Sequence, residues 1–475
     1  MAHNYDVVIL GGGTGGYVAA IRAAQLGLKT AIVERERLGG TCLHKGCIPS
    51  KALLRSAEVY RLANETAADY GVEVAGVTLQ FDKVQARKQA IVEQLSQGVM
   101  ALMKKGKIDV YNGTGRILGP SIFSPMPGTI SVEMSDGSEN EMLVPTNVVI
   151  ATGSKPRSMA GLPVDGKHVL NSDHALQLEA LPKSMLIVGG GVIGIEWASM
   201  LCDFGVEVTV IEYGSAILPT EDADVIKEVT KQLEKRGVRI VTDARIDTET
   251  FKIENDNVFI SANVREQAET FVAEKLLLCV GREANTQGIG LENTEIEVEN
   301  GFIQVNDSYQ TKESHMYAIG DVIGGLQLAH VASHEGICAI EHIATGKTEK
   351  LDALAVPKCV YSHPEVASIG LTERAAKEQG FTLKVGKFPF KAIGKALVNG
   401  DAEGFIKIVA DEETNDVLGI HMVGSHVTDL IGEASLAKLL DATPWEIGQA
   451  IHPHPSLNEG IAEAALAVDS RAIHF

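Results

Sequence analysis

The feature that most constrains the fold is a glycine-rich segment that occurs twice with the same spacing. The first copy runs from a short apolar strand, residues 5–10, into the turn 11–16 and then into an alanine-rich helix that reaches residue 26. The second copy has an apolar strand at residues 185–188 and a turn at 189–194. A strand, a glycine-rich turn and a helix in this order predict a βαβ unit that binds a dinucleotide. Two copies predict two such domains in one chain.

Equivalent positions of the two copies carry the same residue types, and each lies 178 residues after its counterpart. The first glycine allows the tight turn, the second lets backbone approach a pyrophosphate, and the third permits close helix packing. A glutamate at the end of the next strand is placed to accept hydrogen bonds from ribose hydroxyls. The matching residues are Gly11, Gly13, Gly16, Ala20 and Glu34 in the first copy and Gly189, Gly191, Gly194, Ala198 and Glu212 in the second.

A glycine-rich turn can also occur without any ligand, so one copy alone is a weak signal. Here each turn lies between a strand and a helix, and each has an acidic residue at the expected distance. Glu212 also favours NAD over NADP, because a carboxylate repels a 2′-phosphate and residues 213–215 contain no arginine. We therefore predict two dinucleotide sites, the second of them for NAD.

The rest of the chain predicts an α/β fold with a third, α+β domain at the end. The predicted fold is two Rossmann-like dinucleotide-binding domains and this C-terminal domain, with boundaries at 1–149, 150–280, 281–350 for a central segment, and 351–475. The local patterns are a long helix over 83–105, short strands over 113–137, an amphipathic helix over 225–237, a hairpin of strands 405–409 and 417–423, and helices near 427–441 and 459–467.

Composition excludes several classes of function. The chain has 42 basic and 62 acidic residues, a formal net charge of −20, which disfavours nucleic acid and anionic membranes as partners. No apolar run is long enough to span a membrane, and the N-terminus does not resemble a secretory signal. Six cysteines in 475 residues do not form a disulfide scaffold. A cytoplasmic protein is therefore expected, and no histidine or cysteine spacing predicts a metal site.

Cys42 and Cys47 lie in one short segment, residues 39–51. On an ideal helix their Cα atoms would be about 8.6 Å apart, whereas a disulfide needs roughly 4.4–6.8 Å. The segment must therefore be distorted if the pair is oxidised, and Gly46 and Pro49 permit such a turn. Such a disulfide would suit a redox relay. The alternatives are two unrelated thiols or half of a zinc site, although no second cysteine pair would complete the latter.

His454 and Glu459 form a second pair of interest near the C-terminus. His454 precedes Pro455, which favours an extended backbone there. Ser456 and Glu459 then have the spacing of a capping box that opens a helix over 461–466. In the other interpretation Glu459 binds one imidazole nitrogen of His454 and supports acid–base catalysis. The residues alone favour neither interpretation.

Five segments of the chain have the character of family motifs, and these are 39–51, 151–154, 280–282, 317–321 and 452–459. Together they resemble the pyridine nucleotide-disulfide oxidoreductases, a family of flavoenzymes, over essentially the whole chain. The departures are His44–Lys45, where Asn-Val is common, and Ala284, where Pro is frequent. The Ile-Pro-Ser-Lys sequence after Cys47 is most similar to the branch of the family that oxidises dihydrolipoyl groups.

The resemblance implies the roles of individual residues. Cys42 would be the thiol that meets the substrate, Cys47 the thiol beside the flavin, and His454 with Glu459 the acid–base pair. The first glycine-rich domain and the central segment would bind FAD, one molecule per subunit, and the second domain NAD. The implied FAD-site residues are Gly11, Gly13, Gly16, Glu34, Thr41, Lys51 paired with Glu196, Gly115, Asp321 and Ala329, and the implied NAD-site residues are Gly189, Gly191, Gly194, Glu212, Gly281 and Arg282.

The resemblance also implies partners. The C-terminal domain would form a homodimer in which His454 serves the disulfide of the other subunit, so that active sites are shared. The implied substrate is a dihydrolipoyl group on the lipoyl domain of a 2-oxoacid dehydrogenase complex, or of the glycine cleavage system. In such a complex the acyltransferase's binding module would dock the enzyme. Related mercuric reductases add a C-terminal cysteine pair that is missing here, and a non-catalytic scaffold would not need Cys42, Cys47 and His454.

Overall fold

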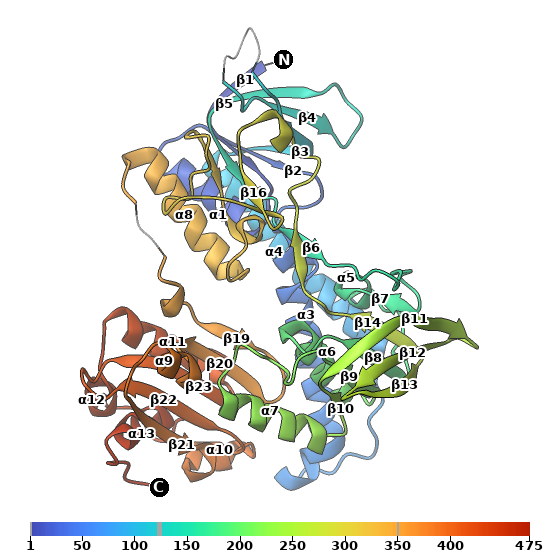
Figure 1. Cartoon of the computed structure of the whole chain (residues 1–475), viewed down its shortest axis with the longest axis vertical. Coiled ribbons are helices and arrows are strands. Elements are labelled where there is room, and N and C mark those ends of the chain that lie inside the picture. The colour runs from blue at the N-terminus through green and yellow to red at the C-terminus, as the bar shows by residue number, and fades with distance from the viewer. Residues whose placement is uncertain (1, 121–125, 349–350) are drawn as a thin grey trace. The chain divides into compact units, whose positions relative to one another are not determined.

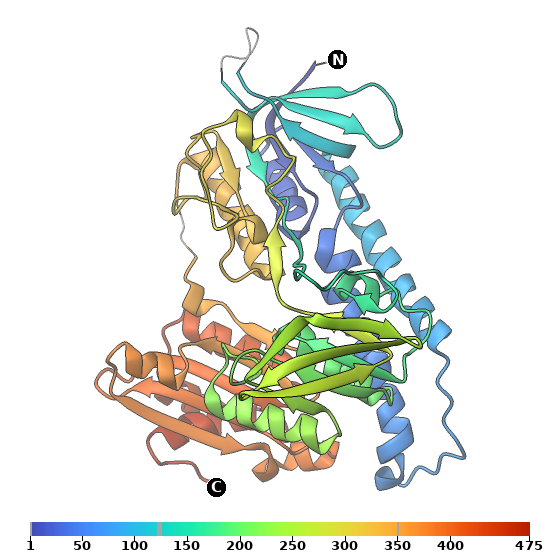
Figure 2. The same ribbon diagram turned by 45° about the vertical axis from the view of Figure 1, so that its right-hand side comes forward.

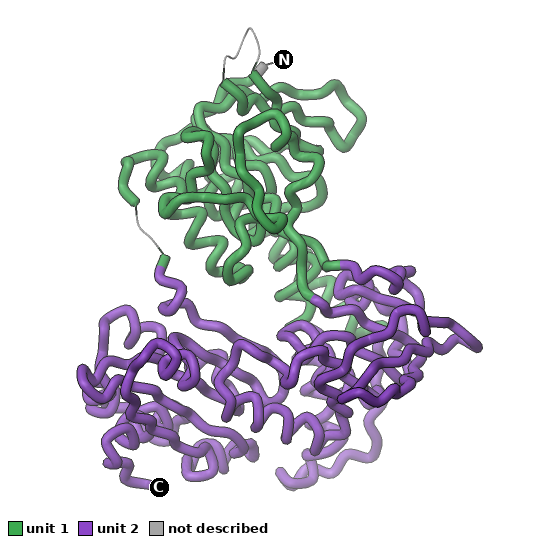
Figure 3. The backbone as a smooth tube through the Cα atoms, in the orientation of Figure 1, with its two compact units in different colours: residues 1–52, 82–157, 281–351 green, residues 53–81, 158–280, 352–475 purple. Residues whose placement is uncertain are grey.

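The computed structural model describes residues 2–120, 126–348 and 351–475. The chain divides into two compact units, each assembled from three segments (Figure 3). Unit 1 contains residues 1–52, 82–157 and 281–351, and unit 2 contains 53–81, 158–280 and 352–475. The central segment therefore packs with the N-terminal domain. The predicted boundary at residue 350, and residues 121–125 of the predicted strands over 113–137, lie outside the described part of the chain.

Unit 1 is built on a mixed sheet whose centre is β1 (Ala2–Leu10). β1 pairs in parallel with β2 (Thr30–Glu34) and with β5 (Glu141–Ile150), and its register sets Leu10 opposite both Val33 and Ile150. β3 (Asp109–Ile117) and β18 (Met316–Ala318) extend the parallel part, while β4 (Ile130–Met134) is antiparallel to β3 and β5. The run of buried Val, Ile and Leu in β1 and β5 is typical of strands covered on both faces.

The predicted helices of unit 1 are confirmed with small shifts of their ends. α1 (Thr14–Gln25) follows the first glycine-rich turn, and α4 (Phe81–Gly106) is the long helix expected over 83–105. α8 (Ala329–Thr345) lies beside α1 (Figures 1 and 2). Glycine at positions 15 and 336 allows this close packing, because a Cβ on either residue would press on the backbone of the other helix.

Unit 2 contains the second glycine-rich copy in an all-parallel sheet with the order β10-β9-β8-β14-β7. β8 (Ser184–Val188) leads through the second glycine turn into α6 (Val192–Asp203), which is followed by β9 (Glu207–Ile211). The expected amphipathic helix is α7 (Ala223–Lys235), which begins at the N-cap Asp222. A separate antiparallel meander follows it. The remaining strands are β7 (Val169–Leu170), β10 (Arg239–Val241), β11 (Ala244–Glu254), β12 (Asn257–Val264), β13 (Gln267–Ala273) and β14 (Lys275–Leu278).

The C-terminal part of unit 2 is a five-stranded antiparallel sheet in the order β19-β20-β23-β22-β21. Its centre is the predicted hairpin, now β22 (Phe405–Asp411) and β23 (Val417–Gly424). The predicted helices are α11 (Val427–Leu439) and α13 (Glu459–Val468), and both contribute apolar side chains to the core of this sheet. The expected α+β character of this region is confirmed.

Apart from the 15-residue helix α3, the other elements are short. No helix in the described part of the chain is long and apolar enough to cross a membrane. The remaining elements are α2 (Gly40–His44), α3 (Cys47–Arg61), α5 (Ser172–Ala175), α9 (Glu373–Glu378), α10 (Gly394–Asn399), α12 (Pro444–Gln449), β6 (Ser154–Pro156), β15 (Arg282–Ala284), β16 (Val298–Glu299), β17 (Phe302–Ile303), β19 (Lys358–Val360), β20 (Glu365–Gly370) and β21 (Leu383–Pro389), with a π-helical turn at Leu62–Thr66.

Candidate active site

The first glycine-rich turn connects the carboxyl end of β1 to α1. Gly11 has a φ of +111°, and a Cβ there would collide with the carbonyl oxygen of Ala151. A Cβ on Gly16 would collide with the carbonyl oxygen of Gly11, so the third glycine sets how closely α1 approaches the turn. Gly13 is the N-cap of α1, receives no side-chain cap, and has open space where a Cβ would be. The helix N-terminus therefore presents uncapped N–H groups to a space that suits a phosphate.

Glu34 ends β2 beside this turn. One carboxylate oxygen accepts the Gly12 N–H at 2.7 Å, and the other accepts the Glu36 N–H at 2.8 Å. Two backbone donors thus fix the carboxylate at the edge of the turn. Each oxygen keeps a lone pair for a further donor such as a ribose hydroxyl.

The second turn repeats this construction. Gly189 has a φ of +109°, Gly194 would collide with the Gly189 carbonyl if it carried a Cβ, and Gly191 is an uncapped N-cap with open space around it. Glu212 accepts the Gly190 N–H and the Gly214 N–H, both at 2.6 Å. The two copies therefore agree in hydrogen bonding as well as in spacing.

The cysteine segment starts directly at the first turn. The Gly39 N–H donates to the Gly12 carbonyl at 2.7 Å, and Gly40 packs so closely on Gly13 that a Cβ on it would lie 2.5 Å from the Gly13 Cα. α2 then carries Cys42 and ends at His44, and α3 begins at Cys47. The helix is interrupted between the two cysteines, as the spacing argument requires for a pair that can join.

Neither Cys42 nor Cys47 forms a disulfide in this structure. A hydrogen bond between the two side chains, together with burial, raises the pKa of the Cys42 thiol well above its ordinary value, while the charge of Lys51 acts in the opposite direction. The reduced pair therefore keeps a proton on Cys42. Lys51 follows Cys47 by one turn of α3, so the two residues share a helix face.

His44 and Lys45, which replace the Asn-Val that is common in the family, form contacts of their own. The His44 Nε2 lies 2.9 Å from the Leu38 carbonyl oxygen, and the Lys45 ammonium pairs with Glu36 at 2.5 Å. These side chains secure the segment before α2. Thr41 is exposed in α2 between the glycines and Cys42.

Asp321 is held by a network inside unit 1. It accepts the Ser154 hydroxyl, and the Arg282 Nε lies 3.7 Å from its carboxylate. Arg282 also donates to the Ser154 hydroxyl at 2.7 Å and to the Ser154 carbonyl at 2.8 Å. On the other side the Gly320 N–H donates to the buried Glu335 at 2.6 Å. The structure therefore joins Arg282, predicted at the NAD site, to Asp321, predicted at the FAD site.

The remaining predicted FAD-site and NAD-site residues have defined positions. Gly115 lies in β3, where a Cβ would press on the side chains of Leu10 and Val33, so packing in the core is itself a reason for glycine there. Ala329 is the first residue of α8. Glu196 is buried in α6, where it accepts the Tyr361 N–H at 3.0 Å. Gly281 has a φ of +101° and accepts the Arg157 N–H through its carbonyl.

His454 and Glu459 lie together after α12. The Nδ1 of His454 is 2.9 Å from one oxygen of Glu459, and the other oxygen accepts the Ser456 N–H at 2.9 Å. The Ser456 bond, with a contribution from His454, holds the pKa of Glu459 below its usual range. Glu459 can therefore both bind the Ser456 N–H and bind His454, because each contact uses a different carboxylate oxygen.

Only half of the predicted capping box is present. The Ser456 N–H donates to Glu459, but the Ser456 hydroxyl does not cap the helix. α13 begins at Glu459 after Asn458, and no side chain caps it. Among the described residues the buried Ser456 hydroxyl has no hydrogen-bond partner. The reason is that residues 450–458 form a loop that turns before the helix starts, so Ser456 lies too early to be the N-cap.

Sequence reasoning missed a second histidine–carboxylate pair beside His454. The Nε2 of His452 is 2.6 Å from Glu433, and the Asn458 side-chain amide donates to the other Glu433 oxygen at 2.8 Å. Glu433 lies in α11, 19 residues before His452. No local spacing could have indicated this contact.

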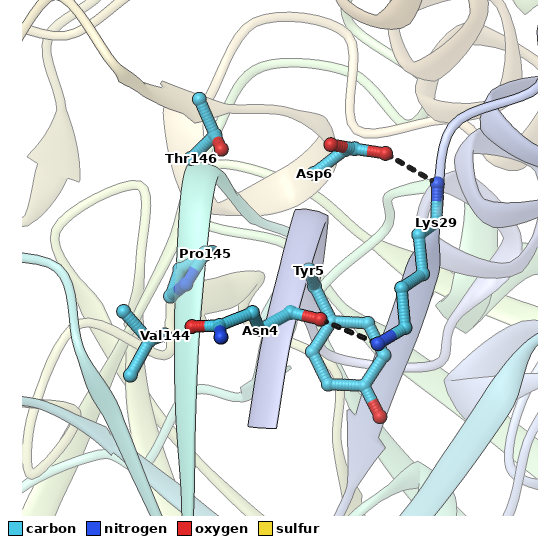
Figure 4. Close-up of a pocket in the computed structure, with 7 residues that line it drawn as sticks. All are labelled: Asn4, Tyr5, Asp6, Lys29, Val144, Pro145 and Thr146. Carbon is cyan, nitrogen blue, oxygen red and sulfur yellow. Dashed lines mark hydrogen bonds between the residues drawn. The ribbon is translucent and has the colours of Figure 1, made fainter. Parts of the chain in front are cut away.

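A shallow depression of about 440 Å³ lies elsewhere in unit 1, between β1, β2 and β5 (Figure 4). Lys29 fills part of it by donating its ammonium to the Asn4 carbonyl and its backbone N–H to Asp6, both at 2.7 Å. Asn4 lies in the first half of β1 and Asp6 at its middle, so this depression is away from the glycine-rich turn that follows Leu10. It takes no part in the site.

Comparison with protein families agrees with this geometry. A family model described as pyridine nucleotide-disulphide oxidoreductase matches residues 5–336. The chain belongs to the pyridine nucleotide-disulphide oxidoreductases. The dimerisation domain of the same family matches residues 356–465, which supports a homodimer. The resemblance that the motifs indicated is thereby confirmed.

Relatives of this disulphide oxidoreductase extend over its full length. The chain is 67% identical over 475 residues to dihydrolipoyl dehydrogenase of Bacillus subtilis, with all of both chains covered. It is 43% identical to the enzyme of the same name from Zymomonas mobilis, again with both chains fully covered. Among solved structures it resembles LpdA from Mycobacterium tuberculosis with a TM-score of 0.89, at 27% identity and 97% and 98% coverage of the two chains.

As a pyridine nucleotide-disulphide oxidoreductase, the protein is an enzyme that uses FAD and NAD. The two glycine turns fit these groups. Each offers an uncapped 12-residue helix, open space at its second glycine and a carboxylate fixed at the strand end. Within the described residues no cluster of three or more metal-binding side chains occurs.

Proposed function

We propose that this enzyme oxidises protein-bound dihydrolipoyl groups to lipoyl groups with NAD, the reaction of a dihydrolipoyl dehydrogenase. The observation that carries the proposal is the cysteine pair at the interrupted helix, attached directly to the first dinucleotide turn. Two relatives with this name are 67% and 43% identical to the chain over the full length of both proteins. We assign FAD to residues 1–149 and 281–350, NAD to 150–280 and dimerisation to 351–475.

The chemistry of the chain itself is thiol–disulfide exchange. Starting from the Cys42–Cys47 disulfide, His454 of one subunit removes a proton from one substrate thiol, and the thiolate attacks the Cys42 sulfur of its partner. The protein disulfide breaks, Cys47 leaves as a thiolate, and a mixed disulfide forms between substrate and Cys42. The second substrate thiol, deprotonated in turn, attacks the substrate sulfur and releases Cys42. Substrate is then oxidised by two electrons and the cysteine pair is reduced.

The two cysteines are suited to different parts of this cycle. In the proposed mechanism Cys47 carries the negative charge, and the raised pKa of Cys42 in the reduced pair favours a proton on Cys42. Lys51, one turn later on α3, offers a cation to that charge. Bound FAD supplies the route by which the electron pair of the dithiol reaches NAD as hydride.

Glu459 prepares His454 for its role. With its pKa held low, the carboxylate stays charged and accepts the Nδ1–H of His454, which leaves Nε2 as the nitrogen that exchanges protons with substrate. The His454 side chain is 79% exposed, as a group that serves a separate partner must be.

The proposal includes a partner and a location. The substrate would be carried by the lipoyl domain of a 2-oxoacid dehydrogenase complex, whose acyltransferase offers a binding module, and the net charge of −20 favours a basic module. We place the reaction in the cytoplasm, where a cysteine pair stays available for redox chemistry. Recovery of the protein in a secreted or membrane fraction would contradict this location.

The experiment is an anaerobic titration of the FAD-loaded protein with dihydrolipoamide, followed by absorbance. We expect a long-wavelength band from the Cys47 thiolate to the flavin at two electrons per subunit, and its loss when NAD is added. The variant Cys47→Ser is expected to lack the band and the turnover. A flavin spectrum unchanged by dihydrolipoamide would refute the proposed substrate, and an active Cys47→Ser variant would refute the relay.

A further inference from the structure

Glu433 connects α11 to both sides of the segment that carries His454. One carboxylate oxygen lies 2.6 Å from the Nε2 of His452, two residues before His454, and the other accepts the Asn458 amide at 2.8 Å, four residues after it. The segment between these contacts is a loop without regular secondary structure. Its backbone therefore depends on side-chain contacts such as these to hold one conformation.

His452 is bonded at both ring nitrogens. Its Nδ1 lies 2.9 Å from the Ala450 carbonyl oxygen, which can only accept, and its Nε2 faces the Glu433 carboxylate. Both nitrogens donate when the ring is an imidazolium, whose charge the carboxylate balances. The His452 side chain is only 8% exposed, so its contact with Glu433 is largely shielded from water.

His454 differs from His452 in the same loop. Only its Nδ1 is bonded, to Glu459, and the structure gives its Nε2 no hydrogen bond within the described residues. One histidine thus anchors the loop and the other presents a nitrogen to a partner. The loop can present His454 reproducibly only if its two ends are fixed.

We propose that Glu433 is a positioning residue for His454, and that it acts by clamping His452 and Asn458 to α11. This inference rests on the proposed function and deepens it, because it names a residue outside the motif that sets the geometry of proton transfer. Glu433 does not touch the substrate or the reacting sulfur atoms. Its effect is confined to the step that uses His454.

The test uses the full-length FAD-loaded protein and compares two activities. Dihydrolipoamide oxidation by NAD requires His454, whereas reduction of ferricyanide by NADH requires no proton transfer at the dithiol. We expect Glu433→Ala to lower kcat with dihydrolipoamide about tenfold or more, since misplacing a catalytic group by about 1 Å costs up to about 10²-fold. The ferricyanide activity is expected to stay within about twofold of wild type.

Two further variants make the result specific. Glu433→Gln keeps an oxygen for Asn458 and an amide for a neutral His452, so we expect it to restore most of kcat. The control Asp429→Asn changes an exposed carboxylate in the first turn of the same helix, 3.9 Å from His426, and is expected to leave both activities unchanged.

The outcomes separate this inference from the function on which it rests. A wild-type protein that does not oxidise dihydrolipoamide overturns the proposed function and this inference with it. A wild type that turns over while Glu433→Ala keeps its kcat overturns the inference alone. Parallel loss of both activities in the Ala and Gln variants also overturns it, because Glu433 would then support the fold in general.

Discussion

Individual carboxylates in this chain are oriented by backbone N–H groups before they meet a functional partner. Glu34 and Glu212 each accept two N–H groups at a glycine-rich turn. Glu459 gives one oxygen to the Ser456 N–H and the other to His454. Because backbone donors are fixed by the fold, the remaining lone pairs point in a set direction. The same residue type is therefore suited to the proposed cofactor binding in one place and to the proposed acid–base chemistry in another.

Glu335 is the exception among these carboxylates, since it is buried with one N–H donor. Burial, with the nearby charge of Asp321, raises its pKa from about 4.5 to about 7, although the Gly320 N–H acts in the opposite direction. A raised carboxyl pKa means that ionisation opposes folding. The free-energy cost of ionising Glu335 in the folded protein is absent below pH 4.5 and complete above about pH 7. It amounts to about 3 kcal/mol, at 1.36 kcal/mol per pH unit.

We therefore predict that Glu335→Gln, which keeps an acceptor for the Gly320 N–H, stabilises the protein at pH 8 but not at pH 4.5. The measurement is urea unfolding of the FAD-loaded protein across this range. Glu341→Gln is the control on the same helix, because Glu341 pairs with Arg22 and is a third exposed. A difference between Glu335→Gln and wild type that does not grow with pH would contradict the assignment.

The residues that sequence could identify are those whose partners are near in the chain. Cys42 and Cys47 lie in one segment, and Glu459 follows His454 by five positions. Glu433 and Glu335 could not be identified, because their roles arise from loops that fold back onto helices. A glutamate in an amphipathic helix is ordinarily a solvated charge, and nothing local distinguishes these two.

At the scale of elements, the glycine-rich turns determine how helix and strand meet. The doubled βαβ pattern was predictable because its strand, turn and helix are contiguous and the first and third glycines of each turn have a steric reason. The start of α13 was not, because a loop can imitate a capping sequence without helical backbone. We expect the third glycine of a turn to act in helix packing and the second to act in nucleotide binding.

The second turn offers a matched pair of variants. Gly194→Ala drives a methyl group into the Gly189 carbonyl, so we predict a loss of roughly 1–3 kcal/mol in the free energy of unfolding. Gly191→Ala meets open space and is predicted to fold normally, but its methyl group occupies the region expected for the pyrophosphate and raises the KM for NAD.

Thermal unfolding and steady-state kinetics with varied NAD distinguish the two effects. The KM for dihydrolipoamide serves as an internal reference, because it is expected to stay near the wild-type value in Gly191→Ala. An unchanged KM for NAD in Gly191→Ala would show that the open space at Gly191 has no role in nucleotide binding.

At the scale of the whole molecule, distant segments are joined by polar contacts that no local pattern announces. Unit 1 combines three separate stretches of sequence. In unit 2, Lys407 of β22 is only 2% exposed and binds Asp222, 185 residues earlier, at 2.8 Å. It also binds Asp224 and Glu373 at 3.1 and 2.7 Å. Removing one partner of such a buried group is costly, so these contacts fix the second dinucleotide domain to the C-terminal sheet within the unit.

The net charge of −20 acts at the same scale, since it belongs to the surface rather than to any one residue. If a basic module docks this enzyme in a complex, the attraction must weaken as the Debye length falls from about 30 Å at 0.01 M salt to about 3 Å at 1 M. We predict that binding to an isolated acyltransferase binding module weakens by at least about tenfold over this range, mainly through slower association.

Surface plasmon resonance measures the association and dissociation rates of this binding. Turnover of free dihydrolipoamide, which is uncharged, is the control and is expected to change far less. Salt-independent binding would mean that an apolar surface, and not the acidic charge, holds the partner.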